Sequence, residues 1–266
     1  MNAHSPDHFD ELDVLVRNSA FKMKINELGL AERYDGRNQD IRVSIIMPTW
    51  NRVSVIRRAI DSVRAQKYGN FELIISDDGS SDATEEVVRQ HCSGDRRMRY
   101  IKHEHAGVSR ARNIGLNHST GQLIAYLDSD NVWSENYLLL MVNSFIDNPG
   151  MNTLYCGLRV IDTVREREFI SFRHYDRTYL LARNYIDMNI FMHTRCLFDR
   201  YGGFDEEINV LEDWDLIVRY TKDNPPYVLE CFLATYYFEK DLEHLSSSEE
   251  LPETFNRIQQ RLSGSW

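Results

Sequence analysis

Two aspartates one residue apart, Asp128 and Asp130, directly follow a short apolar run over residues 123–127. Such a run is typical of a buried strand, and in an extended chain the two carboxylates point to the same side. Carboxylates held this close repel one another unless a cation lies between them. Their hard oxygen ligands favour Mg²⁺ or Mn²⁺, either of which can also hold a phosphate. Alternatively, the acids form a turn in which Ser129 or Asp130 caps the helix that begins near Ser134.

The composition of the chain limits its class. It has 266 residues, of which 42% are hydrophobic and 27% are charged, as is ordinary for a globular enzyme. The net charge of −10 argues against a nucleic-acid partner but leaves room for an anionic substrate held locally by a metal and arginines. The four cysteines are widely separated, which predicts neither a zinc site nor a disulfide framework.

The sequence also indicates where the protein works. No apolar run approaches the length of a transmembrane segment, and the N-terminus lacks a basic-then-apolar signal pattern. We therefore expect that the protein has no transmembrane segment and is located in the cytoplasm. Peripheral association with the inner face of a membrane is compatible with this expectation.

Strand and helix patterns alternate in the first half of the chain. Strand patterns cover residues 43–47, 71–75, 98–102 and 123–127, and helical patterns between them cover residues 53–63, 83–91 and 108–117. This alternation predicts an α/β domain with a mostly parallel sheet flanked by helices. In such sheets ligands bind beyond the carboxyl ends of the strands. Polar clusters follow three of the strands, so we expect them to meet in one crevice: Pro48-Thr-Trp-Asn51, Asp77-Asp78 and Asp128-Ser-Asp130.

Each cluster has a chemical and a structural interpretation. Trp50 offers a face for stacking a nucleobase, or is a core aromatic residue near the surface. Asp78 lies in a turn, but its carboxylate can also accept hydrogen bonds from a nucleobase or ribose. No glycine-rich phosphate loop is present, so a diphosphate must be met by a metal and by arginines, for which Arg110 and Arg112 are candidates. Alternatively, these arginines form a solvated helix face.

Five motifs in order resemble the nucleotide-binding and acceptor-side signatures of family 2 glycosyltransferases, which have the GT-A fold. The resemblance covers residues 41–220. The motifs are Ile46-Met-Pro-Thr-Trp-Asn51, Ile75-Ser-Asp-Asp-Gly-Ser-Ser-Asp82, Gly107-Val-Ser-Arg-Ala-Arg-Asn-Ile-Gly115, Leu127-Asp-Ser-Asp130, and Tyr201-Gly-Gly-Phe-Asp-Glu206 with Leu211-Glu-Asp-Trp-Asp-Leu216.

The resemblance implies a role for each matching residue. Pro48, Trp50 and Asp78 would border the nucleoside of the donor, with Ser129 also on the donor side. Asp128 and Asp130 would form a D-x-D motif that binds Mn²⁺ or Mg²⁺.

On the acceptor side, the resemblance implies that Asp213 is the catalytic base, whereas the residues alone favour Asp213 as a helix N-cap. Glu212, Trp214 and Gly203 would lie near the acceptor. The implied reaction is an inverting transfer of a sugar, from a UDP-sugar by default, to a hydroxyl of a saccharide or glycan.

A third protein ligand for the metal is not assigned by any motif. His193 and His244 are candidates, and the alternative for each is an ordinary core or surface histidine.

We divide the chain into an N-terminal helical extension (1–40), a nucleotide-sugar-binding half (41–150), an acceptor-binding half (151–240) and a C-terminal tail or lid (241–266). The extension is either a helix that contacts a partner or membrane, or one that packs on its own domain. The tail is either a lid or a disordered terminus.

Two other functions remain open from sequence. A sugar-phosphate nucleotidyltransferase would use a similar sheet and metal site, but it needs a basic loop for a nucleoside triphosphate near the first strand. A non-catalytic nucleotide- or carbohydrate-binding module would bind the donor without turnover.

Overall fold

The computed structural model describes residues 7–37, 39–208, 210–239, 254–256 and 258, and it describes side chains from residue 19 onward. His244 and most of the predicted C-terminal tail or lid therefore lie outside the described residues. Among the described helices, none is both long enough and apolar enough to cross a membrane.

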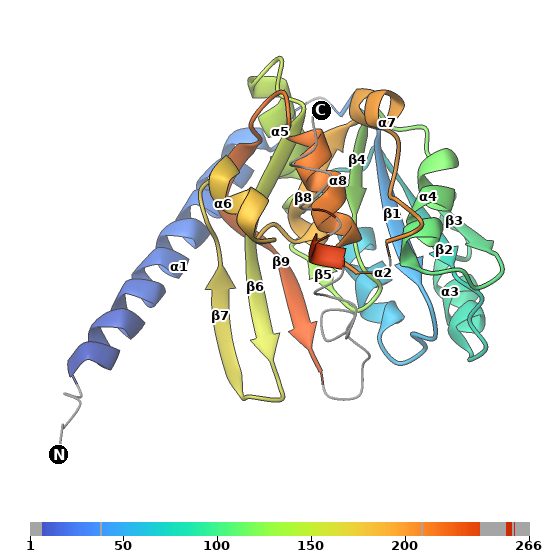
Figure 1. Ribbon diagram of the computed structural model, residues 1–266, viewed down its shortest axis with the longest axis horizontal. Coiled ribbons are helices and arrows are strands. Elements are labelled where there is room, and N and C mark those ends of the chain that lie inside the picture. The colour runs from blue at the N-terminus through green and yellow to red at the C-terminus, as the bar shows by residue number, and fades with distance from the viewer. Residues whose placement is uncertain (1–6, 38, 209, 240–253, 257, 259–266) are drawn as a thin grey trace.

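A single sheet forms the centre of the described part of the chain (Figure 1). Its strands are β1 (Val43–Thr49), β2 (Phe71–Asp77), β3 (Met98–Lys102), β4 (Leu123–Tyr126), β5 (Val132–Trp133), β6 (Thr153–Asp162), β7 (Arg167–Ser171), β8 (Phe191–Thr194) and β9 (Tyr227–Phe238). They lie in the order β3-β2-β1-β4-β8-β6-β9-β5, and β7 pairs with β6 outside this path.

The first four strands form a parallel half of the sheet. Every residue of β1 and β2 is buried, which explains their continuous apolar runs, because a parallel sheet is covered by helices on both faces. β1 lies between β2 and β4, so the chain leaves β1 toward one edge and later returns to its other side. Such a reversal of strand order opens a crevice at the carboxyl ends of the strands.

The second half of the sheet is mixed. β8 runs antiparallel to both β4 and β6, whereas β9 runs parallel to β6. The predicted α/β class is confirmed: strands β1 to β4 are parallel, and the strands beyond β4 run in both directions.

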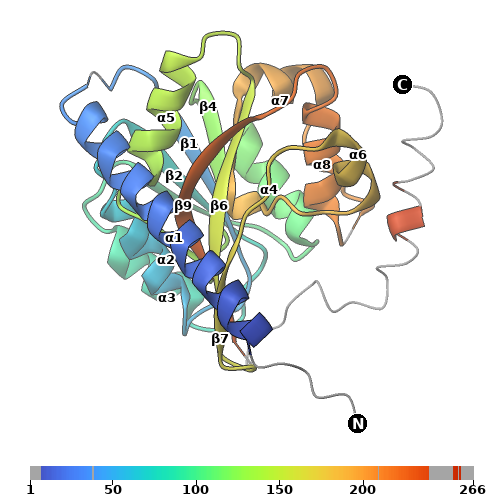
Figure 2. The ribbon, with the colours of Figure 1, turned by 90° about the vertical axis from the view of Figure 1, so that its left-hand side faces the viewer.

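Helices cover both faces of the sheet. Figure 2 shows α1, α2 and α5 on one face and α4, α6, α7 and α8 on the other. Their bounds are α1 (Asp7–Tyr34), α2 (Ile56–Arg64), α3 (Thr84–Cys92), α4 (Val108–Asn117), α5 (Tyr137–Asp147), α6 (Arg177–Ala182), α7 (Arg195–Tyr201) and α8 (Glu212–Tyr220), with a short 3-10 helix η1 (Met188–Ile190).

The C-terminal part of α1 packs on the domain. Met23 and Tyr34 are buried, and the Asn26 side chain donates to the Glu230 carbonyl of β9 with an Nδ2–O distance of 3.0 Å. The opposite face of α1 exposes Phe21 among other apolar residues. The helix thus covers the mixed half of the sheet, and its N-terminal part extends past β7 (Figure 1).

Candidate active site

A cavity of about 570 Å³ lies at the carboxyl ends of β1, β2 and β4. It joins the donor-side and the acceptor-side residues predicted from sequence. Those that line it are Pro48, Trp50, Asp78, Arg112, Asp128, Ser129, Asp130, Glu212 and Asp213. A second cavity of about 640 Å³ lies beside α1 and contains none of the predicted site residues.

Asp128 is held on the cavity wall by Asn189 and Arg112. The Asn189 side-chain oxygen accepts a hydrogen bond from the Asp128 backbone N–H (2.7 Å), and Asn189 Nδ2 donates to Asp128 Oδ2 (3.0 Å). Arg112 donates to the other carboxylate oxygen, Oδ1, at 2.9 Å. These bonds fix the direction of the carboxylate before any ligand binds.

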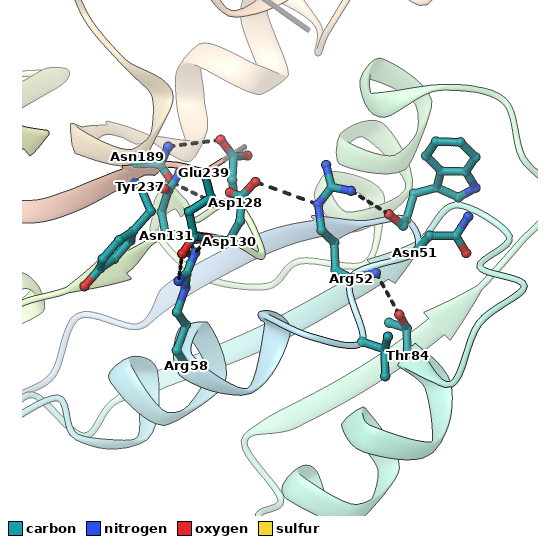
Figure 3. A network of polar contacts seen from close by, with 12 residues as sticks. Asn51, Arg52, Arg58, Thr84, Asp128, Asp130, Asn131, Asn189, Tyr237 and Glu239 are labelled. Carbon is teal, nitrogen blue, oxygen red and sulfur yellow. Dashed lines mark hydrogen bonds and ion pairs between the residues drawn. The ribbon is translucent and has the colours of Figure 1, made fainter. Parts of the chain in front are cut away.

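The backbone carbonyl of Asp130 is held by Arg58. Arg58 donates two hydrogen bonds to this carbonyl oxygen, at 3.0 and 2.6 Å (Figure 3). The same guanidinium pairs with Glu239 at the end of the described part of β9. The side chain of Asp130 lies 3.7 Å from Arg52 Nε, and both residues line the cavity.

Arg112 lies on the cavity wall and is paired with two protein carboxylates. The residue is only 4% exposed, and its guanidinium forms ion pairs with Glu212 (2.6 Å) and Asp128 (2.9 Å). The two carboxylates hold the pKa of Arg112 above its usual value against the effect of burial. The terminal nitrogens are thus committed to protein carboxylates, so the structure favours a bridge between the D-x-D motif and α8 over a phosphate contact. Arg110 is exposed and does not line the cavity.

Asp213 lies at the start of α8, beside Glu212. The side-chain nitrogen of Asn184 lies 3.2 and 3.1 Å from its two carboxylate oxygens, and the Trp214 backbone N–H donates to Oδ1 at 2.7 Å. Burial and the neighbouring Glu212 carboxylate raise the pKa of Asp213 to about 7. Such a carboxyl group can exchange a proton near neutral pH, as a general base must. Leu211, directly before this pair, has a φ of +62°, a left-handed conformation that costs about 1–2 kcal/mol.

Two further polar residues of the cavity were not predicted. Asp187 accepts from both the backbone and the side chain of Asn189, each at 2.8 Å. Burial and the nearby Asp128 raise the pKa of Asp187 to about 6. Tyr236 of β9 also lines the cavity, and burial and surrounding carboxylates, Asp187 foremost, raise its pKa, so its hydroxyl remains a donor.

The end of the cavity that is predicted to border a nucleoside is built around Asp78. Its carboxylate oxygens accept from the backbone N–H groups of Ala106 (2.8 Å) and Gly107 (2.9 Å), and Gly107 adopts a φ of +96° that suits glycine. His105 stacks on Trp50 with ring centroids 4.7 Å apart. The aromatic face at this end is thus formed by two residues, of which only Trp50 was predicted.

Besides Arg110, three predicted residues are not brought into the cavity: His193, Trp214 and Gly203. His193 is fully buried, and its ring nitrogens lie 2.9 Å from the Tyr126 hydroxyl and from the Thr194 carbonyl. Burial lowers the pKa of His193 to about 4. This is the core-histidine alternative, because neither nitrogen is available to a metal.

On the acceptor side, Trp214 and Gly203 do not line the cavity. The Trp214 ring is buried and donates to the Leu180 carbonyl at 2.6 Å. Gly203 packs against the Asn113 side chain, where an added Cβ would lie 2.3 Å from Oδ1. Both residues therefore hold α8 and the preceding loop in place and do not face the cavity.

The carboxylates of the cavity suit a divalent cation that takes some of its ligands from the protein and the rest from a bound nucleotide. Asp128 and Asp130 supply hard oxygen atoms on one wall of the cavity, as Mg²⁺ and Mn²⁺ prefer. In the described residues, no group of three or more His, Cys, Asp or Glu side chains could hold a metal alone. Phosphate oxygens of a bound nucleotide are the natural source of the remaining ligands.

The sheet and its helices define an α/β fold of the GT-A type, with a cavity at the carboxyl ends of its parallel strands. Residues 44–202 match the model of glycosyl transferase family 2. The chain therefore belongs to this family. The resemblance inferred from the motifs is confirmed.

Individual relatives agree with this assignment. The chain is 37% identical over 124 residues to an Escherichia coli protein named UDP-Glc:alpha-D-GlcNAc-diphosphoundecaprenol beta-1,3-glucosyltransferase WfgD, covering 46% of this chain and 48% of that protein. The chain spans 16% and 60% of the lengths of the first two curated glycosyltransferases that it matches.

Solved structures share the fold. Staphylococcus aureus TarS residues 1–349, in complex with UDP-GlcNAc, align with a TM-score of 0.69 and 22% identity over 82% of this chain and 64% of that chain. The mannosyltransferase PcManGT of Pyrobaculum calidifontis, in complex with GDP-Man and Mn²⁺, aligns with a TM-score of 0.59 and 19% identity over 85% and 70%.

Proposed function

We propose that the protein transfers a sugar from a UDP-sugar to a hydroxyl group of a saccharide or glycan acceptor, with inversion at the anomeric carbon. One observation carries the proposal: Asp213 lines the same cavity as Asp128 and Asp130. A sugar between them can lose its diphosphate toward the D-x-D acids and be attacked by an acceptor hydroxyl that gives its proton to Asp213.

The residues of the cavity divide the work. Pro48, Trp50 and Asp78 border the nucleoside, and Asp128 and Asp130 would hold a divalent cation. When bound, Mn²⁺ or Mg²⁺ would neutralise charge on the leaving diphosphate. Asn184 keeps Asp213 in place through both carboxylate oxygens.

Several similarities support the choice of donor. The E. coli relative is named for UDP-Glc, TarS was solved with UDP-GlcNAc, and PcManGT was solved with GDP-Man and Mn²⁺. UDP is therefore the first nucleotide to test, and GDP is the second. The name of the E. coli relative also specifies a diphosphoundecaprenol-linked acceptor. We therefore also propose that this protein is cytoplasmic and acts at the inner face of a membrane.

The test is a screen of UDP-, GDP-, ADP- and dTDP-sugars for Mn²⁺- or Mg²⁺-dependent transfer and hydrolysis. Asp213→Asn should bind the donor as the wild type does but lower the transfer rate about 10²–10⁴-fold, because it removes the general base. Asp130→Asn should weaken metal-dependent donor binding. Asp61→Asn, an exposed acid on α2, is the matched control and should change neither.

Three outcomes would contradict the proposal. If Asp213→Asn transferred sugar at the wild-type rate, Asp213 would not be the general base. Donor binding without turnover would favour the non-catalytic module, and synthesis of a nucleotide sugar from a nucleoside triphosphate and a sugar phosphate would favour the nucleotidyltransferase.

A further inference from the structure

The charges of the cavity raise the question of what binds the diphosphate of the donor. Most charged residues that line the cavity are acids, and the arginines among the described lining residues are Arg52 and Arg112. Arg112 is buried and paired with Asp128 and Glu212. We propose that Arg52 is the residue that binds the donor diphosphate and thereby sets the affinity for nucleoside diphosphates. This inference rests on the proposed function.

The position of Arg52 matches this role. Its NH1 group donates to the Trp50 carbonyl at 3.2 Å, and its Nε lies 3.7 Å from Asp130 Oδ2. The guanidinium therefore lies between the Trp50 carbonyl, beside the proposed nucleoside site, and the carboxylate of Asp130. Figure 3 shows Arg52 reaching toward Asp130. In a nucleoside diphosphate, the phosphates occupy that same interval, between the base and the cation.

The backbone around Arg52 is fixed, whereas the contact between its side chain and Asp130 is long. The Arg52 backbone N–H donates to Thr84 Oγ1 at 2.8 Å, and Asn51 directly before it adopts a φ of +50°. Charge-assisted N–H···O bonds are normally about 2.7–2.9 Å long, so 3.7 Å to Asp130 is a loose contact. A phosphate is a better partner for this guanidinium because it accepts two parallel hydrogen bonds.

Neighbouring arginines do not share this geometry. Arg58 donates to the Asp130 carbonyl and to the Glu239 carboxylate, and it does not line the cavity. Arg57 has a side chain 70% exposed, paired with Asp61 on the surface of α2. Arg57 is therefore a matched control, with the same charge on the same segment of the chain.

The experiment compares nucleoside and nucleoside diphosphate binding by calorimetry with Mg²⁺ present. Uridine and UDP are titrated into the wild type, Arg52→Ala, Arg52→Lys and Arg57→Ala. In Arg52→Ala, UDP affinity should fall about tenfold or more while uridine affinity stays unchanged, because one charge-assisted contact is lost. Arg52→Lys should recover part of the affinity, and Arg57→Ala should match the wild type. Thermal unfolding curves establish that each variant is folded.

Two results would overturn the proposal. One is equal UDP affinity in wild type and Arg52→Ala; the other is an equal loss for uridine and UDP, which would mean that Arg52 only shapes the nucleoside site. Failure of the proposed function gives a different result. If the wild type binds UDP but transfers no sugar, the proposed reaction is wrong and the proposed role of Arg52 in diphosphate binding stands. If the wild type binds none of UDP, GDP, ADP or dTDP, both the proposed function and the proposed role of Arg52 are wrong.

Discussion

The side-chain amide of Asn184 faces the carboxylate of Asp213, with Nδ2 3.2 and 3.1 Å from the two oxygens. The amide stabilises the ionised carboxylate, and it opposes the upward effect of burial and Glu212 on the pKa of Asp213. Asn184 therefore acts as a positioning residue for the proposed base.

Asn184→Ala should lower kcat about 10–100-fold while the donor KM stays unchanged, because a hydrogen bond to a charged group is lost on the acceptor side only. The acidic limb of the pH–rate profile should also move to higher pH, since the pKa of Asp213 rises without the amide. The exposed Asn117→Ala is the control. An unchanged pH profile in Asn184→Ala would rule out the positioning role.

The transfer rate should depend on pH through Asp213. Because burial and Glu212 raise its pKa to about 7, kcat/KM should rise between about pH 6 and pH 8 as the base loses its proton. Initial rates over this range, with the donor saturating and then limiting, check the prediction. A flat profile would mean that the base is another group or that a step other than proton transfer limits the rate.

Asp213 should also cost the folded protein stability. Its pKa in the folded state lies above its ordinary value of 3.8, so the folded state binds a proton that the unfolded chain has released. Stability is therefore lost as the pH rises from about 4 to 7. Asp213→Asn should raise the free energy of unfolding at pH 8 by on the order of 1 kcal/mol and leave it unchanged near pH 4. Urea denaturation at both pH values measures this, and a destabilised variant at pH 8 would contradict it.

Removal of Arg112 should destabilise the fold strongly. Arg112→Ala leaves the buried Glu212 and the nearby Asp128 without their cation, at a cost of about 3–5 kcal/mol. Arg159→Ala breaks the exposed pair with Glu168 and should cost less than about 1 kcal/mol. Equilibrium denaturation of both variants compares them, and similar costs would show that the Arg112 bridge is not structural.

Glu27 connects α1 to the start of α5. Its carboxylate accepts from Ser134 (2.8 Å) and from Asn136 (2.9 Å) and is 1% exposed. Burial alone would raise the pKa of Glu27, but hydrogen bonds from Lys24, Asn136 and Ser134 bring it below the ordinary value. A lowered pKa gives stability that is present above the ordinary pKa and is lost as the pH falls through the folded value.

Glu27→Ala should therefore cost about 2 kcal/mol at pH 7 and less at pH 3. Glu32→Ala, an exposed change on the same helix, serves as the control and should stay within about 0.5 kcal/mol of the wild type. Equal effects of the two variants at pH 7 would show that α1 is not anchored through Glu27.

Sequence reasoning was most effective where a motif follows a buried strand directly. Pro48, Asp78 and Asp128 each come at the end of an apolar run, and the parallel arrangement of β1, β2 and β4 brings them to one edge. Arg52 directly follows the first motif, so its position in the cavity could have been predicted in the same way.

Other parts of the site depend on contacts that no local pattern encodes. Arg112 meets Glu212, which lies 100 residues further along the chain, and this pairing changes its role. Asn184 and Asp187 come from a stretch without helical or strand periodicity. His193 lies on β8, and pairing with β4 carries it into the core.

Strand β9 joins the two ends of the molecule: at Glu230 it accepts a hydrogen bond from Asn26 of α1, and at Tyr236 it lines the cavity. The family match ends at residue 202, before Asp213 and before β9. A protein shortened to the residues that match the family model would therefore lack the proposed base and one wall of the cavity. A shortened chain that keeps the whole cavity must include α8 and β9 at least as far as Tyr236.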